Sequence, residues 1–311
     1  MLTGLAGSVL LAVSAWLASP WGLGFAGRSN TLPIRWAQLA PAVAGIALLF
    51  MGWLGLRTAA IGQLWRSFVI WCAPLLVSPP LLSKDAWAYL EQGWIVLRGF
   101  DPYLTGLSLN GGPFAERVDI YWQGTTTVYP PLALLIQAGV VAISGTHPFW
   151  SLLAMRLPGV LAVVVIGACL PRIAKATGQD AAAALWLGLA NPLLVVHFVG
   201  GAHNDAWAVA LGVAGIWCAV RWRAAWPLGC VLVGLGMAVK QPIGLMMVAV
   251  ALYGVAAGPD VPARQAWRAT LGQAVWRLPV GLLATLAGFA IPTLVSGWGI
   301  GWATGSGAPQ T

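Results

Sequence analysis

The chain has 311 residues, of which 59% are hydrophobic and 8% are charged, and its formal net charge is +8. A soluble domain is about 45–50% apolar and about 25% charged, so this composition excludes an ordinary soluble protein. The basic residues are dispersed at the ends of apolar runs and form no basic stripe, which argues against a nucleic-acid-binding protein.

Apolar runs recur along the whole chain, and most of them are long enough to cross a hydrocarbon core of about 30 Å as a helix. Because a bilayer offers backbone groups no partner outside their own helix, we expect an all-α, polytopic transmembrane helix bundle. We expect a single transmembrane domain over residues 1–311, with spans at 4–25, 37–56, 64–82, 156–171, 182–199, 206–220, 227–239, 242–257 and 278–296.

Residues 129–145 form a further apolar segment, which begins with "YPPLALLI". If this segment crossed the membrane, the basic residues of loops 172–180, 221–226 and 258–277 would move outside, against the positive-inside rule. Two prolines also suit the first turn of a helix better than a helix interior. We therefore expect a re-entrant or surface segment here, and an outer loop at 83–128.

The stretch "SKDAWAYLEQGWIVLRGFDPY" opens this outer loop. Ser83 suits a helix N-cap and Gly99 suits a C-terminal stop, so we expect a helix between them. Large apolar residues recur at helical spacing on one face, while Asp85, Tyr89 and Gln92 lie on another. This pattern predicts an amphipathic juxtamembrane helix on the outer membrane surface.

Asp85 has two interpretations. A carboxylate in the first turn of a helix solvates the helix start and interacts favourably with the helix dipole. An ionised carboxylate at a water–lipid boundary can also accept a proton from a sugar hydroxyl. The polar residues of the neighbouring outer loops favour the second interpretation.

Two short loops between apolar runs carry these polar residues. "GGAHNDA" places His203, Asn204 and Asp205 at the outer surface, either as a satisfied loop turn or as ligand-binding residues. "VKQP" places Lys240 just before a helix-breaking proline. A cation beside backbone groups freed by a proline suits a phosphate, although a lysine at the end of a span is often structural.

Arg98 and Arg156 also lie on the expected outer side, and Arg156 additionally suits a headgroup anchor at the start of a span. The four cysteines lie singly in apolar runs without CxxC spacing, which indicates buried thiols. His203 and Asp205 supply only two ligands to a metal. We expect no cofactor, and the pattern leaves a divalent metal open.

Five stretches occur in order along about residues 78–245: "SKDAWAYLEQGWIVLRGFDPY", "VYPPLALLIQAGVVAISG", "MRLPGVLAVVVIGACLPRIAKATG", "LWLGLANPLLVVHFVGGAHNDA" and "LVGLGMAVKQP". Together they resemble the glycosyltransferase C superfamily, and within it the actinobacterial polyprenol-phosphomannose-dependent α-(1→6)-mannosyltransferases of lipoglycan synthesis. Each stretch alone is weak evidence, whereas five in register are specific. Chains of that family are longer, so the resemblance implies that this chain is an N-terminal portion of the family fold.

The resemblance implies an enzyme that moves mannose from polyprenyl phosphomannose to a growing α-(1→6)-mannan of a lipoglycan. It places the active site on the outer, periplasmic face of the plasma membrane and excludes nucleotide sugars as donors. A β-linked donor and an α-linked product imply inversion by one direct displacement.

The resemblance also implies roles for residues. It assigns the role of general base to Asp85. It assigns binding of the carrier phosphate to Lys240, with Arg98 or Arg156 as alternatives for that second role. No nucleophile–base pair of the kind that covalent catalysis requires is evident in the sequence. The expected substrate-binding residues are Lys240, His203, Asn204, Asp205, Arg98, Arg156, Asp101, Tyr103 and Tyr129.

Two other functions stay open at this point. A carrier or flippase for a lipid-linked sugar would place polar residues at mid-membrane and often repeats its halves. The charges here crowd one face instead, which favours chemistry at the surface. An inactive, truncated partner protein is the other alternative.

The predicted topology has a direct test. A cysteine at Asn110, in the outer loop, should react with a membrane-impermeant maleimide in intact spheroplasts. A cysteine at Gly178, in the predicted inner loop 172–180, should react only after permeabilisation. The reverse pattern of labelling would place the acidic loop in the cytosol and contradict the prediction.

Overall fold

The computed structural model describes residues 1–19, 32–253 and 263–304, and these ranges confirm the all-α fold because their elements are all helical. The ends of the expected spans 4–25 and 242–257 lie outside the described residues. The α-helices are α1 (Leu2–Leu17), α2 (Leu32–Leu54), α3 (Ile61–Leu76), α4 (Asp85–Leu97), α5 (Ile120–Gln123), α6 (Pro131–Ser144), α7 (Pro148–Ala176), α8 (Ala181–Gly188), α9 (Asp205–Arg221), α10 (Trp226–Met237), α11 (Met246–Leu252), α12 (Ala263–Ser296) and α13 (Gly301–Thr304). Short 3₁₀ segments are η1 (Ala115–Arg117), η3 (Arg223–Ala225) and η4 (Gln241–Leu245), and η2 (Leu194–Gly200) is a π-helix.

Among the described residues, 3 helices are long and apolar enough to cross a membrane. They are Ala37–Leu54 in α2, Pro148–Ala176, which is α7, and Leu271–Ser296 in α12. These helices, together with shorter apolar helices such as α1 and α6, make the chain a membrane protein. The larger number of spans and the single domain over the whole chain stay predictions.

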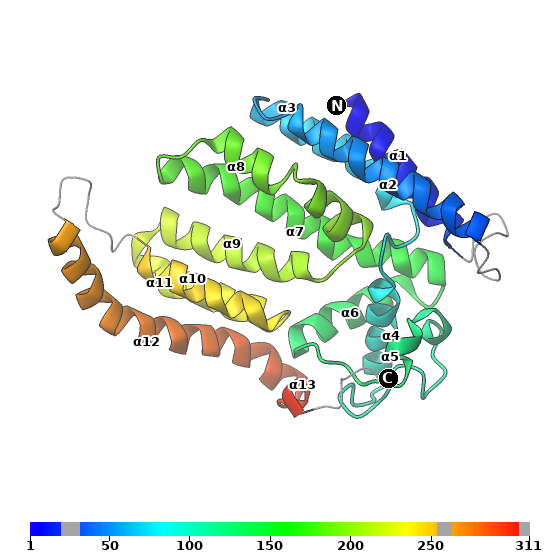
Figure 1. Cartoon of the computed structure of the whole chain (residues 1–311). Coiled ribbons are helices and arrows are strands. Elements are labelled where there is room, and N and C mark those ends of the chain that lie inside the picture. The colour runs from blue at the N-terminus through cyan, green and yellow to red at the C-terminus, as the bar shows by residue number, and fades with distance from the viewer. Residues whose placement is uncertain (20–31, 254–262, 305–311) are drawn as a thin grey trace.

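The helices form a row in which α1, α2 and α3 lie at one end, α7 to α10 in the middle and α12 at the other end (Figure 1). Helix α1 packs against α2 and α3, α7 packs against α9, and α10 packs against α9 and α12. Glycines allow the closest approaches: a Cβ added at Gly45 would lie 2.7 Å from the Gly7 carbonyl oxygen. Such small-residue contacts are typical of helix packing in membranes.

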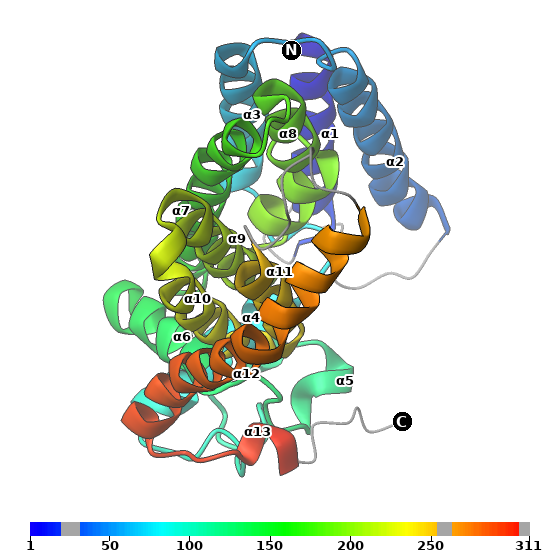
Figure 2. The ribbon, with the colours of Figure 1, turned by 90° about the vertical axis from the view of Figure 1, so that its left-hand side faces the viewer.

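A second view shows α5, α6 and α13 at the end of the molecule away from α1, α2 and α3 (Figure 2). Helix α6 begins with Pro131 in its first turn, as the sequence predicts. Its 14 residues span only about 21 Å at 1.5 Å per residue, which is less than a hydrocarbon core. Helix α6 packs against α4 and α7.

Helix α4 stops before Gly99 as predicted, but its N-cap is Lys84 and not Ser83, and the helix is more buried than a surface helix. The backbone N–H of Asp85 donates to Ser83 Oγ at 3.0 Å, and Gly99 ends the helix with a φ of +77°, which glycine adopts without strain. Leu90 and Glu91 are fully buried. The segment after the helix folds back onto it, since the Phe114 N–H donates to Glu91 Oε2 at 3.0 Å. Helix α4 is therefore enclosed by protein on both faces.

The span expected at 182–199 is wrong as one continuous helix, because it is broken into α8 and η2. Pro192 has no N–H to continue the α-helical hydrogen bonds. The side chain of Asn191 accepts a hydrogen bond from the Leu193 N–H at 2.9 Å, which competes with the helix. Helix α3 likewise ends at Leu76, earlier than the span expected at 64–82. Both interruptions free backbone carbonyls close to the candidate site.

Candidate active site

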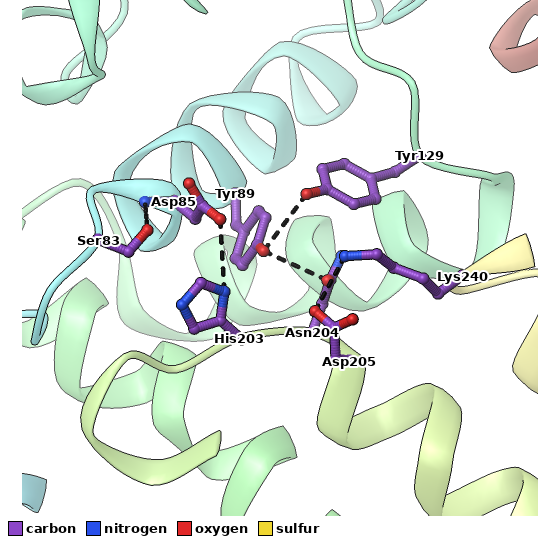
Figure 3. A network of polar contacts seen from close by, with 8 residues as sticks. All are labelled: Ser83, Asp85, Tyr89, Tyr129, His203, Asn204, Asp205 and Lys240. Atoms are coloured by element: carbon purple, nitrogen blue, oxygen red, sulfur yellow. Dashed lines mark hydrogen bonds and ion pairs between the residues drawn. The ribbon is translucent and has the colours of Figure 1, made fainter. Parts of the chain in front are cut away.

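Polar and aromatic side chains from distant parts of the chain meet beside the first turn of α4 (Figure 3). They come from the start of α4, the segment before α6, the start of α9 and the segment before η4. The cluster therefore brings together several residues that the sequence predicts for the site. Its members are Ser83, Asp85, Tyr89, Tyr129, His203, Asn204, Asp205 and Lys240.

The carboxylate of Asp85 faces His203. Asp85 Oδ2 lies 3.4 Å from His203 Nδ1. The hydrogen bond from His203 is the largest effect that lowers the pKa of the Asp85 carboxyl, although burial opposes it. The hydrogen bond at Ser83 and the charge of Lys240 lower the same pKa further. Asp85 is therefore ionised at neutral pH, as a general base must be.

The ammonium of Lys240 faces Asp205. Lys240 Nζ lies 2.9 Å from Asp205 Oδ2 and 5.4 Å from the centroid of the Tyr129 ring. Burial lowers the pKa of Lys240, but Tyr129 and Asp205 outweigh it, so the pKa lies above its ordinary value. Lys240 is therefore a cation at neutral pH and lies across the cluster from Asp85.

Tyr89 links the elements of the site. Its hydroxyl lies 3.4 Å from the Tyr129 hydroxyl and donates to Asn204 Oδ1 at 3.3 Å. Burial raises the pKa of Tyr89, which keeps this phenol neutral and able to donate. The sequence pattern assigned no role to Tyr89, although its spacing from Asp85 places both residues on one face of a helix.

Three predicted residues lie outside the centre of the cluster. Tyr103 donates from its hydroxyl to the Tyr129 carbonyl at 3.0 Å, and Asp101 Oδ1 accepts from the Tyr103 N–H at 2.8 Å. These two residues position Tyr129. Arg98 is exposed, its guanidinium lies 5.9 Å from the Trp94 ring centroid, and it is not among the residues that line the cavity containing Lys240.

Arg156 is also absent from the cluster, which corrects its expected place. Its side chain is 2% exposed, so it neither binds phosphate at the site nor anchors a span to headgroups. Its Nη2 donates to the carbonyls of Ser78 at 2.7 Å, Pro79 at 3.2 Å and Gly200 at 3.2 Å, and its Nε donates to that of Val199 at 3.3 Å. These carbonyls lie just after α3 and at the end of η2.

Strained backbone follows each of the segments that Arg156 holds. Among the described residues, Leu82 (φ 60°) and Ala202 (φ 54°) are the non-glycine residues with positive φ. Leu82 precedes Asp85 by three residues, and Ala202 directly precedes His203. Such conformations cost of order 1–3 kcal/mol and persist only where the surrounding structure holds them. Arg156 supplies that support to both loops.

Asp85 lies on the wall of two cavities. The larger has a volume of about 690 Å³ and the smaller about 90 Å³. A third cavity of about 420 Å³, mostly apolar, shares Asn191, Leu193 and His197 with the larger one. The larger cavity is lined by Asp85, Gly188, Asn191, Leu193, Leu194, His197, Phe198, His203, Asp205, Val209 and Lys240. The smaller cavity is lined by Asp85, Ala88, Tyr89, Gln92, Leu107, Trp122, Thr125, Thr126, Thr127, Val128 and Tyr129.

The part of the chain that the structure describes contains no group of three or more His, Cys, Asp or Glu side chains arranged to hold a metal. The expectation that the site works without a cofactor stays a prediction.

The fold and the site together define an all-helical membrane protein in which a carboxylate and a lysine face one polar centre between helix ends. The chain belongs to the family described as "Alpha-(1->6)-mannopyranosyltransferase, N-terminal domain", whose model matches residues 1–257. This finding confirms the family resemblance expected from the five stretches.

Curated relatives come from actinobacteria. The chain is 31% identical over 266 residues to alpha-(1->6)-mannopyranosyltransferase A of Mycobacterium tuberculosis, a match that covers 84% of this chain and 50% of the relative. It is 30% identical over 313 residues to alpha-(1->6)-mannopyranosyltransferase B of Corynebacterium glutamicum, covering 93% of this chain and 48% of the relative. The chain thus spans about half the length of these relatives. No solved structure matches it.

The structural role of Arg156 can be tested by measuring the free energy of unfolding of a variant. Replacing Arg156 with Met should lower the free energy of unfolding by roughly 2–5 kcal/mol, because buried carbonyls lose a charged donor. Thermal unfolding of the purified chain in detergent measures this change. Arg172→Met, on the exposed side of the same helix, is the matched control and should change stability by less than about 0.5 kcal/mol. Equal effects of both substitutions would contradict the assigned role.

Proposed function

We propose that this chain carries the catalytic centre of a membrane mannosyltransferase that moves mannose from a polyprenyl phosphate carrier to an α-(1→6)-mannan on the outer face of the membrane. The observation that carries this proposal is the position of Asp85, an ionised carboxylate on the wall of two cavities, one of which contains Lys240. The names of the relatives support the mannosyl group and the α-(1→6) linkage.

In the proposed reaction, Asp85 accepts the proton of the acceptor 6-hydroxyl. The acceptor oxygen attacks C1 of the mannose from the face opposite the phosphate. The bond between C1 and the phosphate oxygen breaks, and its electron pair leaves with the polyprenyl phosphate. One base and one displacement are sufficient, and this inverts the configuration at C1 without a protein nucleophile.

Lys240 would stabilise the negative charge that develops on the departing phosphate. Its ammonium stays charged because Asp205 and Tyr129 raise its pKa. A preorganised cation in a partly buried site stabilises developing charge more than the same cation in water. The donor phosphate would compete with Asp205 for Lys240, because Lys240 Nζ and Asp205 Oδ2 are in direct contact at 2.9 Å.

The larger cavity has the chemistry that a lipid-linked donor requires. Its lining combines Lys240, Asp205 and His203 with apolar residues such as Leu194 and Phe198. It shares residues with the neighbouring apolar cavity, which extends the apolar surface. A charged end joined to an apolar groove suits a phosphate attached to a long isoprenoid chain.

The base assignment predicts the effect of Asp85→Asn. This substitution should reduce transfer from polyprenyl phosphomannose by at least about 100-fold, because the amide cannot accept the proton. The measurement is formation of labelled mannoside by the purified chain in nanodiscs. Glu116→Gln, an exposed carboxylate in the same outer loop, is the matched control and should retain activity. Normal transfer by Asp85→Asn would show that another group is the base.

Lys240→Ala should weaken binding of the donor more than binding of the acceptor. In the proposed complex, the carrier phosphate is the part of the substrates that this lysine contacts. We expect the KM for the donor to rise about tenfold, the equivalent of a charged hydrogen bond of about 1.4 kcal/mol. The KM for the acceptor should change less than about twofold. A parallel increase in both constants would instead indicate that Lys240 only holds Asp205 and the fold.

A further inference from the structure

The segment that follows α12, residues 297–304, packs against the outer loop at Tyr103. A Cβ added at Gly301 would lie 2.4 Å from Tyr103 Cδ2, so the backbone at the start of α13 rests directly on the tyrosine ring. Trp298 contacts the same ring edge-on, with the two centroids 6.5 Å apart. Tyr103 is only 3% exposed. Residues 297–304 therefore form a strap that holds a buried side chain of the outer loop.

The strap is itself anchored to the helix bundle. The ring of Trp302 lies edge-on against that of Phe289 in α12, with the centroids 5.6 Å apart. Helix α12 packs against α10 and α6, and α13 lies at the end of α12 that faces the outer loop (Figure 2). The position of Tyr103 is thus tied to the helices that flank the candidate site.

Tyr103 in turn holds the segment that carries Tyr129. The Tyr103 hydroxyl donates to the Tyr129 carbonyl at 3.0 Å, and the Thr127 N–H donates to the Pro102 carbonyl at 3.4 Å. The Tyr129 N–H donates to Thr127 Oγ1 at 3.1 Å. Burial raises the pKa of Tyr103, so its phenol is neutral and keeps the proton that it donates.

Tyr129 and its neighbour contact the loop that carries Lys240. Lys240 Nζ lies 5.4 Å from the centroid of the Tyr129 ring, and Gln241 Nε2 donates to the Val128 carbonyl at 3.4 Å. Burial lowers the pKa of Lys240, and Tyr129 is the largest of the effects that raise it. A displacement of Tyr129 would therefore change both the place and the charge environment of the lysine.

We propose that Tyr103 is a positioning residue for Lys240, which acts through Tyr129, and that the strap is the element that fixes Tyr103. Its kinetic consequence rests on the proposed transferase function, in which Lys240 binds the carrier phosphate. The competing explanation is that Tyr103 only fills space between α13 and the outer loop. The two roles need different atoms, because packing requires the ring whereas positioning also requires the hydroxyl.

The kinetic test uses the purified chain in nanodiscs. Tyr103→Phe keeps the ring and removes the hydroxyl, so it should raise the KM for polyprenyl phosphomannose about three- to tenfold, as expected for one lost hydrogen bond. The acceptor KM should change less than about twofold. Tyr121→Phe, the same substitution at an exposed position of the same loop, should leave both constants unchanged.

Gly301→Ala tests the strap. The added methyl group would displace the Tyr103 ring although the hydroxyl is still present, so the donor KM should rise as in Tyr103→Phe. Gly272→Ala in α12 is the matched control, because a Cβ there meets no atom within 4 Å, and it should leave the donor KM unchanged.

A second measurement does not depend on mannose transfer. The chain has three lysines, Lys84, Lys175 and Lys240, so NMR of the reductively methylated chain can follow the titration of each one. The pKa of Lys240 should fall in Tyr103→Phe and Gly301→Ala, because Tyr129 raises it in the unaltered chain. The other two lysines lie outside the cluster and should titrate as in the unaltered chain.

Thermal unfolding establishes that each variant is folded, and Tyr103→Phe decides the question if Gly301→Ala does not fold. An unchanged Lys240 titration and donor KM in folded Tyr103→Phe, or an equal loss for donor and acceptor, overturns the positioning role. Transfer by the unaltered chain would still leave the proposed function standing. A lowered Lys240 pKa in the variants, without any transfer by the unaltered chain, supports the positioning role and overturns the proposed function.

Discussion

The side chain of Arg156 donates hydrogen bonds to carbonyls at the ends of two helical segments, and the candidate site depends on this interaction. In a membrane protein a helix can break only where another group satisfies the freed backbone, because lipid supplies no hydrogen bonds. Arg156 does this after α3 and at the end of η2. The loops that carry Asp85 and His203 follow these two helix ends. The buried guanidinium of Arg156 satisfies the backbone carbonyls at these helix ends, and the irregular loops that follow them position the reactive groups.

The second feature of the site is that each of its two main charged groups lies next to a group of opposite charge or a hydrogen-bond partner. Asp85 is paired with His203, and Lys240 is paired with Asp205. The phenols of Tyr89 and Tyr129 lie beside the two pairs (Figure 3), and their hydroxyls are 3.4 Å apart. Each charge therefore has a partner in a partly buried setting, where an isolated charge would be neutralised by a shift of its pKa. A carboxylate and an ammonium that both stay ionised are the two charged groups that the proposed displacement requires.

Sequence patterns predicted much of this arrangement. The apolar runs predicted the helices, and short polar loops between them predicted that Asp85, His203 and Lys240 belong to one site. The prolines at the start of α6 and the glycine after α4 predicted helix ends from rules that act over a few residues. The same reasoning failed for Arg156. An arginine at the start of an apolar run has the same local pattern whether it faces headgroups or the carbonyls of distant loops.

The sequence by itself determined the helical class, the membrane setting and the identity of the polar residues, because hydropathy, charge and turn residues are local properties. Only the tertiary structure decided that Tyr89 joins the site, that α4 is enclosed, and that the apolar run at 182–199 is broken into two helices. It also decided that Gln92 and Thr126 line a second cavity beside Asp85. These features depend on contacts between segments far apart in the chain, and no pattern within a single segment records which segment will fold against it.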